Sequence, residues 1–218
     1  MTQLEQQERE AEKDAKELLL LLLLGGAVVF RSDVGRFYVN GKSVSITTIR
    51  KYLQRIERNL GRRLTKLTDD LEAQKITLAK WQREFERSIT SAHILAGALA
   101  VGGINAAVRN DEIQARIASE LKYADNFGDE VKDKKVSPAR MKSRAKSYLI
   151  AATITYGILE LQVRKLMGGY TECRRIRRAS ESCPGCVAYA YRWMPIGMIP
   201  PIGSLQCGGR CRCYLEYR

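Results

Sequence analysis

The chain has 218 residues, of which 45% are hydrophobic and 28% are charged, an ordinary globular balance that excludes disorder along its whole length. Lys and Arg total 37 against 24 Asp and Glu, and the net charge of +13 points to an acidic partner: nucleic acid, an anionic membrane or an acidic protein surface. A single histidine and few acid–base clusters argue against most hydrolytic chemistry, so we expect no enzyme and no catalytic residues.

The N-terminal segment combines an acidic stretch with a long apolar run. Residues 1–24 carry three basic and six acidic side chains, so we expect no secretory signal peptide, which needs a basic start. The apolar run of residues 18–30 is shorter than the roughly 20 residues of a membrane-spanning helix, and Gly25 and Gly26 interrupt it. A helix end buried in a core or a subunit interface is the favoured interpretation, with membrane insertion as the alternative. Consecutive leucines make a helix apolar on every side, so we expect a partner surface. Its residues are Leu18, Leu19, Leu20, Leu21, Leu22, Leu23 and Leu24.

Residues 37–44 predict a β-hairpin, because Asn40-Gly41 supplies the positive φ angles of a two-residue type I′ turn. The next helix has Thr47 or Thr48 as its N-cap, and apolar residues recur along it at spacings of three and four. This heptad pattern breaks at Gly61, which predicts a bend or a local unwinding there.

The outward face of this helix is basic. A solvated face explains the charges, and contact with nucleic-acid phosphates is the alternative. The cations are Arg50, Lys51, Arg55, Arg58, Arg62, Arg63 and Lys66.

Three more helices follow along the chain. One covers residues 78–99, and another covers residues 110–126, after which the polar and glycine-containing residues 125–135 predict a linker. Ser137-Pro138, an N-cap followed by a proline at the first helical position, starts a helix that extends to residue 167.

The only histidine, His93, lies beside an apolar helix stripe, which favours a packing or capping role over that of a ligand or base. The predicted fold class is mainly α: long helices with one small β-hairpin and a small C-terminal cysteine-rich module like a zinc ribbon. We divide the chain into a charged helix with an apolar segment (1–30), a hairpin with a helical body (31–133), and a long basic helix with the cysteine-rich module (134–218).

All six cysteines fall in the last 46 residues. Cys183-Pro184-Gly185-Cys186 is a CxxC knuckle, which places two thiolates on one side of a metal ion, and a second cysteine group completes a tetrahedron with Zn–S bonds of about 2.3 Å. The expected ligands are Cys183, Cys186, Cys207 and Cys211, with Cys213 as a substitute. Structural zinc is the favoured hypothesis, because thiols stay reduced in a cytosol. Disulfides remain the alternative, because a protein that leaves the cell can oxidise later.

The C-terminal part holds nearly all of the excess charge, since residues 134–218 carry 16 basic and four acidic side chains. Arginines precede the first knuckle and lie among the last cysteines, where they are candidates for contact with nucleic-acid phosphates or with an acidic protein patch. They are Arg174, Arg175, Arg177, Arg178, Arg210 and Arg212. The aromatic residues between the two cysteine groups are suited to base stacking, but a small module needs them as its core.

The cysteine module resembles a known protein family. The segments that carry the resemblance are Ser182-Cys183-Pro184-Gly185-Cys186, Trp193-Met194-Pro195-Ile196-Gly197, Pro200-Pro201-Ile202-Gly203 and Cys207-Gly208-Gly209-Arg210-Cys211-Arg212-Cys213. Together they are similar to the C-terminal module of tailed-phage minor head proteins, the phage Mu-type head morphogenesis family. Members of that family commonly have a CxxC pair, a proline-rich loop, and a His or Cys shortly before Cys-Arg-Cys. Here Cys207 stands where many members have His, and its spacing to Cys211 is one residue longer than the common form.

The resemblance implies a structural virion protein, present in few copies, that acts near the portal during head assembly. The implied partners are portal or capsid proteins, copies of the chain itself and, at the basic end, packaged DNA. The implied location is the virion, preceded by the host cytoplasm during assembly. Two other hypotheses remain open: a zinc-stabilised nucleic-acid-binding protein outside any virion, and a membrane-active virion protein that is ejected with the genome.

Overall fold

The structure of the protein is a computed structural model, and it describes residues 29–31, 36–39, 41–166, 168–178, 181–207, 211 and 213–218. The predicted partner surface, which runs from Leu18 to Leu24, and the candidate contacts Arg210 and Arg212 lie outside the described residues. Within them the fold is mainly α-helical, with small antiparallel sheets and a C-terminal cysteine cluster, which confirms the predicted fold class.

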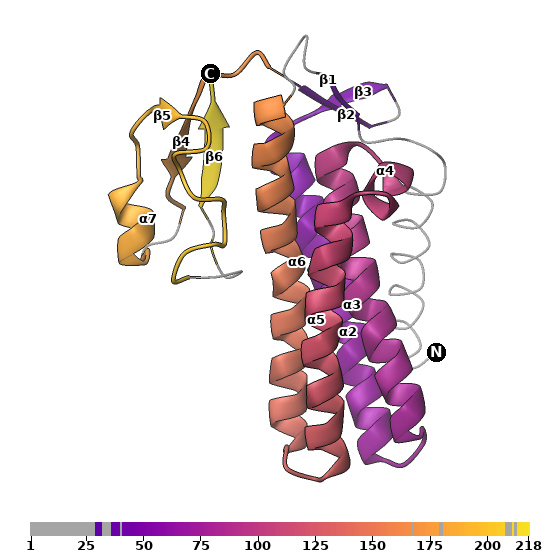
Figure 1. Ribbon diagram of the computed structural model, residues 1–218. Helices are drawn as coiled ribbons and strands as arrows, with labels where there is room; N and C mark the ends of the chain where they lie inside the picture. Colours follow the sequence, from indigo (N-terminus) through magenta and orange to yellow (C-terminus); the bar gives the residue numbers. More distant parts are fainter. Residues whose placement is uncertain are drawn as a thin grey trace, which may run out of the picture.

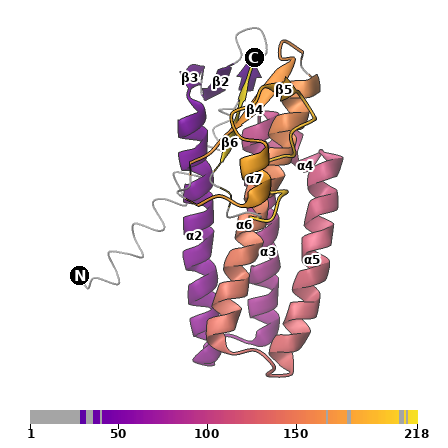
Figure 2. The same cartoon turned by 90° about the vertical axis from the view of Figure 1, so that its left-hand side faces the viewer.

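Four long helices form an elongated bundle (Figure 1): α2 (Ile46–Glu72), α3 (Leu78–Val101), α5 (Asp111–Lys132) and α6 (Pro138–Leu166). The α3 helix is central, because it packs against each of the other three, and the short α4 helix (Ile104–Val108) follows it. The α2 helix also packs against α6, whereas α2 and α5 lie at opposite edges of the bundle (Figure 2). Among the helices in the described part of the chain, none is both long and apolar enough to span a membrane.

A small antiparallel sheet covers one end of the bundle (Figure 1). It consists of β1 (Val29–Arg31), β2 (Arg36–Val39) and β3 (Lys42–Val44), in that order. Val39 pairs with Lys42, so two residues form the turn, and Gly41 has a φ angle of 72°, which confirms the predicted hairpin. The sequence did not predict β1. Because β1 pairs with β2, the last residues of the apolar run form a strand and not the end of a helix.

The C-terminal module lies beside α6 (Figure 1). Its antiparallel sheet has the order β5-β4-β6, formed by β4 (Glu172–Ile176), β5 (Met194–Pro195) and β6 (Tyr214–Tyr217). The short helix α7 (Pro184–Ala188) completes the module.

The α2 helix differs from its prediction at its start and in its middle. Ser45, and not Thr47 or Thr48, is the N-cap, because its hydroxyl accepts a hydrogen bond from the backbone N–H of Thr48 at 3.2 Å. The helix continues through Gly61 without a break, so the predicted bend is wrong. A Cβ at Gly61 would lie 3.7 Å from Cδ1 of Leu149, an ordinary contact distance, so packing against α6 supports the helix where the heptad pattern slips.

The predicted linker at residues 125–135 is wrong over most of its length, because α5 continues to Lys132. The polar residues of this stretch are largely exposed, while Phe127 and Gly128 are buried, which is the pattern of an amphipathic helix. The polar composition therefore marks the solvent face of α5, and residues 133–137 alone connect it to α6.

Two predicted helix starts are confirmed. The side chain of Asn110 accepts a hydrogen bond from the backbone N–H of Ile113 at 3.1 Å, which caps α5. The hydroxyl of Ser137 accepts one from the N–H of Arg140 at 3.4 Å, which caps α6. Both caps satisfy N–H groups that a helix leaves without an internal partner.

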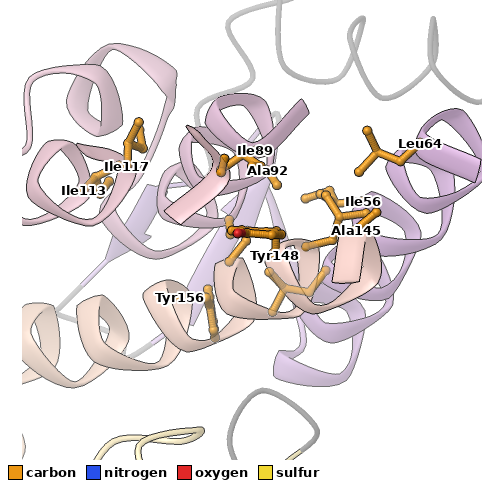
Figure 3. Packing of buried hydrophobic residues seen from close by; sticks show 14 of the residues in the cluster. Ile56, Leu64, Ile89, Ala92, Ile113, Ile117, Ala145, Tyr148 and Tyr156 are labelled. Carbon is orange, nitrogen blue, oxygen red and sulfur yellow. The ribbon is translucent and has the colours of Figure 1, made fainter. Parts of the chain in front are cut away.

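Aromatic and apolar side chains of all four long helices build the bundle core. Trp81 and Phe85 of α3 stack with ring centroids 5.0 Å apart, and Tyr148 of α6 meets Phe85 edge-on at 5.3 Å. Smaller residues fill the space between the helices (Figure 3). Of these the figure labels Ile56, Leu64, Ile89, Ala92, Ile113, Ile117 and Ala145, and it also labels the larger Tyr148 and Tyr156.

His93 is part of this core. Its side chain is buried, and Nδ1 lies 2.8 Å from the hydroxyl of Thr155, so the hydrogen bond joins α3 to α6. This position confirms the predicted packing role.

The α6 helix belongs to both the bundle and the module. Most of its buried residues face the bundle, but Leu161 lies in the apolar core of the module. Gly157 touches the module as well, because a Cβ there would lie 2.8 Å from the carbonyl oxygen of Ile202. The boundary that we placed at residue 134 thus precedes a helix that is shared by the two cores.

Replacing Gly157 tests this contact. Gly157→Ala is expected to destabilise the protein by about 1–3 kcal/mol, because the new methyl group meets a backbone carbonyl that a side-chain rotation cannot move. The matched control is Gly61→Ala, also inside a helix, which is expected to leave stability unchanged or to raise it by up to about 1 kcal/mol. The measurement is the free energy of unfolding in urea, and equal effects of the two variants would contradict the close contact.

Because His93 is buried, we expect the protein to lose stability in acid. Burial, and to a smaller extent the charge of Arg116, lowers the pKa of His93 to about 4. In an unfolded chain the pKa is about 6.5, so between these values the unfolded state binds more protons, and stability falls as the pH is lowered from about 6.5 to about 4. The expected loss is about 3 kcal/mol. It is measured as the difference in unfolding free energy between the wild type and His93→Gln, and a difference that stays constant with pH would exclude this role.

Candidate metal centre

Three chain segments bring the cysteines of the module together. Cys183 is the N-cap of α7, with a proline at the first helical position, so this turn presents Cys183 and Cys186 on one side. Cys207 comes after the loop that follows β5, and Cys211 and Cys213 come just before β6. The cluster therefore depends on contacts between segments far apart in the sequence.

The sulfur atoms lie at distances that suit one metal ion. Sγ of Cys186 is 3.5 Å from Sγ of Cys207 and 3.7 Å from Sγ of Cys211. A tetrahedral ion with sulfur bonds of about 2.3 Å holds its sulfurs about 3.8 Å apart. Two groups of three cysteines each have all their sulfurs within 4.8 Å, and they are Cys183, Cys186 and Cys207, and Cys186, Cys211 and Cys213. Because Cys186 belongs to both, these residues form one five-cysteine cluster that is able to hold a metal ion.

Three of the four predicted ligands, Cys183, Cys186 and Cys207, form one of these groups. The fourth, Cys211, joins Cys186 and the predicted substitute Cys213 in the other. All six cysteines of the chain are free, and no two of the described sulfurs are joined as a disulfide. Cys173 stands apart: it is fully buried in β4 and belongs to neither group of three.

The environment changes how readily these thiols ionise. Burial opposes ionisation of Cys183, but hydrogen bonds from the backbone N–H groups and the thiols of Cys186 and Cys207 outweigh it and lower the pKa of Cys183 to about 7. Burial and the neighbouring thiols raise the pKa of Cys186 well above its usual range and that of Cys207 to about 12. Burial opposes ionisation of Cys211 too, but a hydrogen bond from the backbone of Cys213 and the neighbouring thiols outweigh it and lower the pKa of Cys211. The cluster thus favours thiolates at Cys183 and Cys211, and a bound cation helps Cys186 and Cys207 to give up their protons.

Arg175 was predicted to contact nucleic acid or an acidic partner, and this prediction is wrong, because its side chain is 0% exposed. Nη1 donates to Sγ of Cys186 at 3.4 Å and to Sγ of Cys211 at 3.8 Å, and Nη2 donates to the carbonyl oxygens of Pro200 and Pro201. Buried and partly buried residues alternate along β4, so Arg175 and Cys173 lie on the same, inner face of the strand. The guanidinium therefore lies inside the module, against the five-cysteine cluster.

The other three described arginines of this group lie nearer the surface. Arg174 forms an ion pair with Glu216 at 2.8 Å, and Arg177 donates to the hydroxyl of Ser182 at 3.1 Å. Arg178 is exposed. It is thus the member of the group that is best placed to meet a partner.

Cation–π contacts that the sequence did not predict join the module to the bundle. The guanidinium of Arg50, from α2, lies 4.1 Å from the ring centre of Tyr214, and that of Arg164, from α6, lies 4.3 Å from that of Tyr217. Arg164 is buried with Glu160, its ion-pair partner at 3.6 Å. The four-residue spacing of Glu160 and Arg164 on an apolar helix face is a sequence signal that could have predicted this ion pair. For Arg175, the alternation of side chains along a strand could have predicted that its side chain points inward.

Comparisons with known proteins add no family assignment. No protein-family model matches the chain, no curated protein matches it, and no solved structure matches it. Function must therefore be inferred from the geometry of the five-cysteine cluster and from the surfaces around it.

A pair of cysteine variants tests the metal site. Cys186→Ala is expected to remove most of the bound metal, because Cys186 belongs to both groups of three. Cys173→Ala removes a buried cysteine outside both groups and is expected to keep the metal. The measurement is elemental analysis of protein purified without chelators. Full metal content in Cys186→Ala, or none in the wild type, would contradict the assignment.

Proposed function

We propose that the chain is a structural protein whose C-terminal module is held together by one zinc ion, and that it serves as a minor component of a phage head, near the portal. The observation that carries this proposal is the five-cysteine cluster, enclosed in a module whose core continues into α6. A metal ion surrounded by cysteine sulfurs alone supports structure, whereas catalytic zinc sites keep one position open for water or substrate.

The donor set favours zinc over other common cations. Calcium and magnesium take oxygen ligands, while cysteine thiolates in a tetrahedral arrangement are the usual ligands of structural zinc. The distances of 3.5 Å and 3.7 Å from the sulfur of Cys186 to two neighbouring sulfurs fit that geometry.

The rest of the molecule also supports a structural role. His93, the only histidine of the chain, is buried between α3 and α6 and hydrogen-bonded to Thr155, where it is shielded from substrates. Long helices with a shared core form a stiff body that is suited to contacts between proteins. The partners that we propose are portal or capsid proteins and further copies of the chain.

The phage head assignment follows from the resemblance of the cysteine module to the phage Mu-type head morphogenesis family. Exposed basic groups support contact with packaged DNA. Arg178 is exposed on the module, and Lys51, Arg58 and Arg62 are exposed on the face of α2 opposite its buried side. Such cations contact phosphates without reading the base sequence.

The test is quantitative mass spectrometry of purified virions from the source of the chain, with copies counted against the portal protein. A low and reproducible copy number is expected. Absence of the chain from both mature particles and assembly intermediates would overturn the head assignment. Elemental analysis of the isolated protein tests the zinc separately, with one ion per chain expected.

A further inference from the structure

Arg175 is a buried cation that needs a counter-charge. Its guanidinium stays protonated in proteins, and its side chain has no exposed surface. In the described part of the chain no carboxylate forms an ion pair with it, and its contacts are the sulfurs of Cys186 and Cys211 and the carbonyl oxygens of Pro200 and Pro201. A buried charge without an opposite charge nearby is strongly unfavourable. The balancing negative charge therefore has to come from the cysteine sulfurs.

The state of the sulfurs decides whether that charge exists. Four thiolates around a divalent zinc ion carry a net charge of −2. The same sulfurs carry no charge when they are thiols, and none when they are paired as disulfides. Of these three states, the zinc complex is the one that places the most negative charge beside the buried guanidinium.

We propose that Arg175 is a positioning residue of the metal centre, which stabilises the four-thiolate zinc complex through its charge and its hydrogen bonds to sulfur. This inference rests on the proposed zinc centre and says what sets its affinity for the metal. It also explains why zinc is favoured over disulfides in this module, since a disulfide leaves Arg175 without a counter-charge.

The geometry supports a direct role. Nη1 of Arg175 reaches Cys186, which both groups of three cysteines share, and Cys211. Hydrogen bonds from outside the first ring of ligands orient those ligands and tune the metal, and they are typical of structural and catalytic sites alike. Nη2 holds the proline loop through two carbonyl oxygens, so one side chain joins the loop to the sulfurs.

The experiment measures the zinc affinity of the full chain by competition with a chelator of known affinity. Arg175→Met, which removes the charge, is expected to weaken zinc binding about 10–100-fold. Arg175→Lys keeps the charge and is expected to recover most of that loss. The matched control is Arg174→Met, which removes a neighbouring arginine from the outer face of the same strand and is expected to change the affinity less than about twofold.

The cobalt(II) spectrum separates a role of the Arg175 charge from a merely structural role of its side chain. At saturating cobalt, Arg175→Met is expected to keep the sulfur-to-metal charge-transfer bands of the wild type, because all the sulfur ligands remain. Altered bands would mean that the variant has lost ligands through misfolding, which would overturn a role of the charge. Should Arg175→Met fail to fold, Arg175→Gln is the second neutral variant for both measurements.

The outcomes separate this inference from the proposed function. Equal zinc affinity in the wild type and Arg175→Met would overturn the role of Arg175 and leave the zinc centre standing. Arg175→Lys as weak as Arg175→Met would also overturn it, because the charge would then contribute nothing. A wild-type chain that binds no zinc would overturn the zinc centre and this inference together.

Discussion

The inward-facing side chain of Arg175 is the contact on which the C-terminal module depends. It joins α7 through Cys186, the segment before β6 through Cys211, and the proline loop through Pro200. Its backbone carbonyl accepts a hydrogen bond from the N–H of Tyr191 at 2.8 Å, so the chain after α7 is held as well. A module this small buries little apolar surface, and in such modules metals and polar contacts supply stability that a larger core gives to bigger domains.

The module is also fixed to the bundle, through α6. Leu161 packs into the module core, and Gly157 lets the backbone at Ile202 approach the helix closely. A metal centre placed here is attached to a helix of 29 residues that runs the length of the bundle. The module and the helical body are therefore joined through one continuous helix, which supports the structural role proposed above.

Local patterns predicted the parts of the structure that local physics decides. The period of apolar residues predicted the long helices, Asn40-Gly41 predicted the hairpin, and cysteine spacing predicted which sulfurs come together. The end of α5 was missed, because an exposed helix face and a linker have the same polar composition. Arg175 was misplaced because the inward direction of its side chain depends on Cys186 and on β6, which are distant in the sequence.

A buried charged pair of α6 also contributes to how the module sits on the bundle. Arg175 pairs with Leu215, and Tyr217 lies two residues farther along β6 on the same face of the sheet. Arg164 of α6 covers the ring of Tyr217. Burial raises the pKa of Glu160, yet the charge of Arg164 opposes that rise and pairs with the carboxylate. Buried ion pairs add little net stability, but an arrangement that separates them is strongly penalised. The buried Arg164–Glu160 pair of α6, which lies against Tyr217 of the module, thus disfavours other positions of this sheet on the bundle.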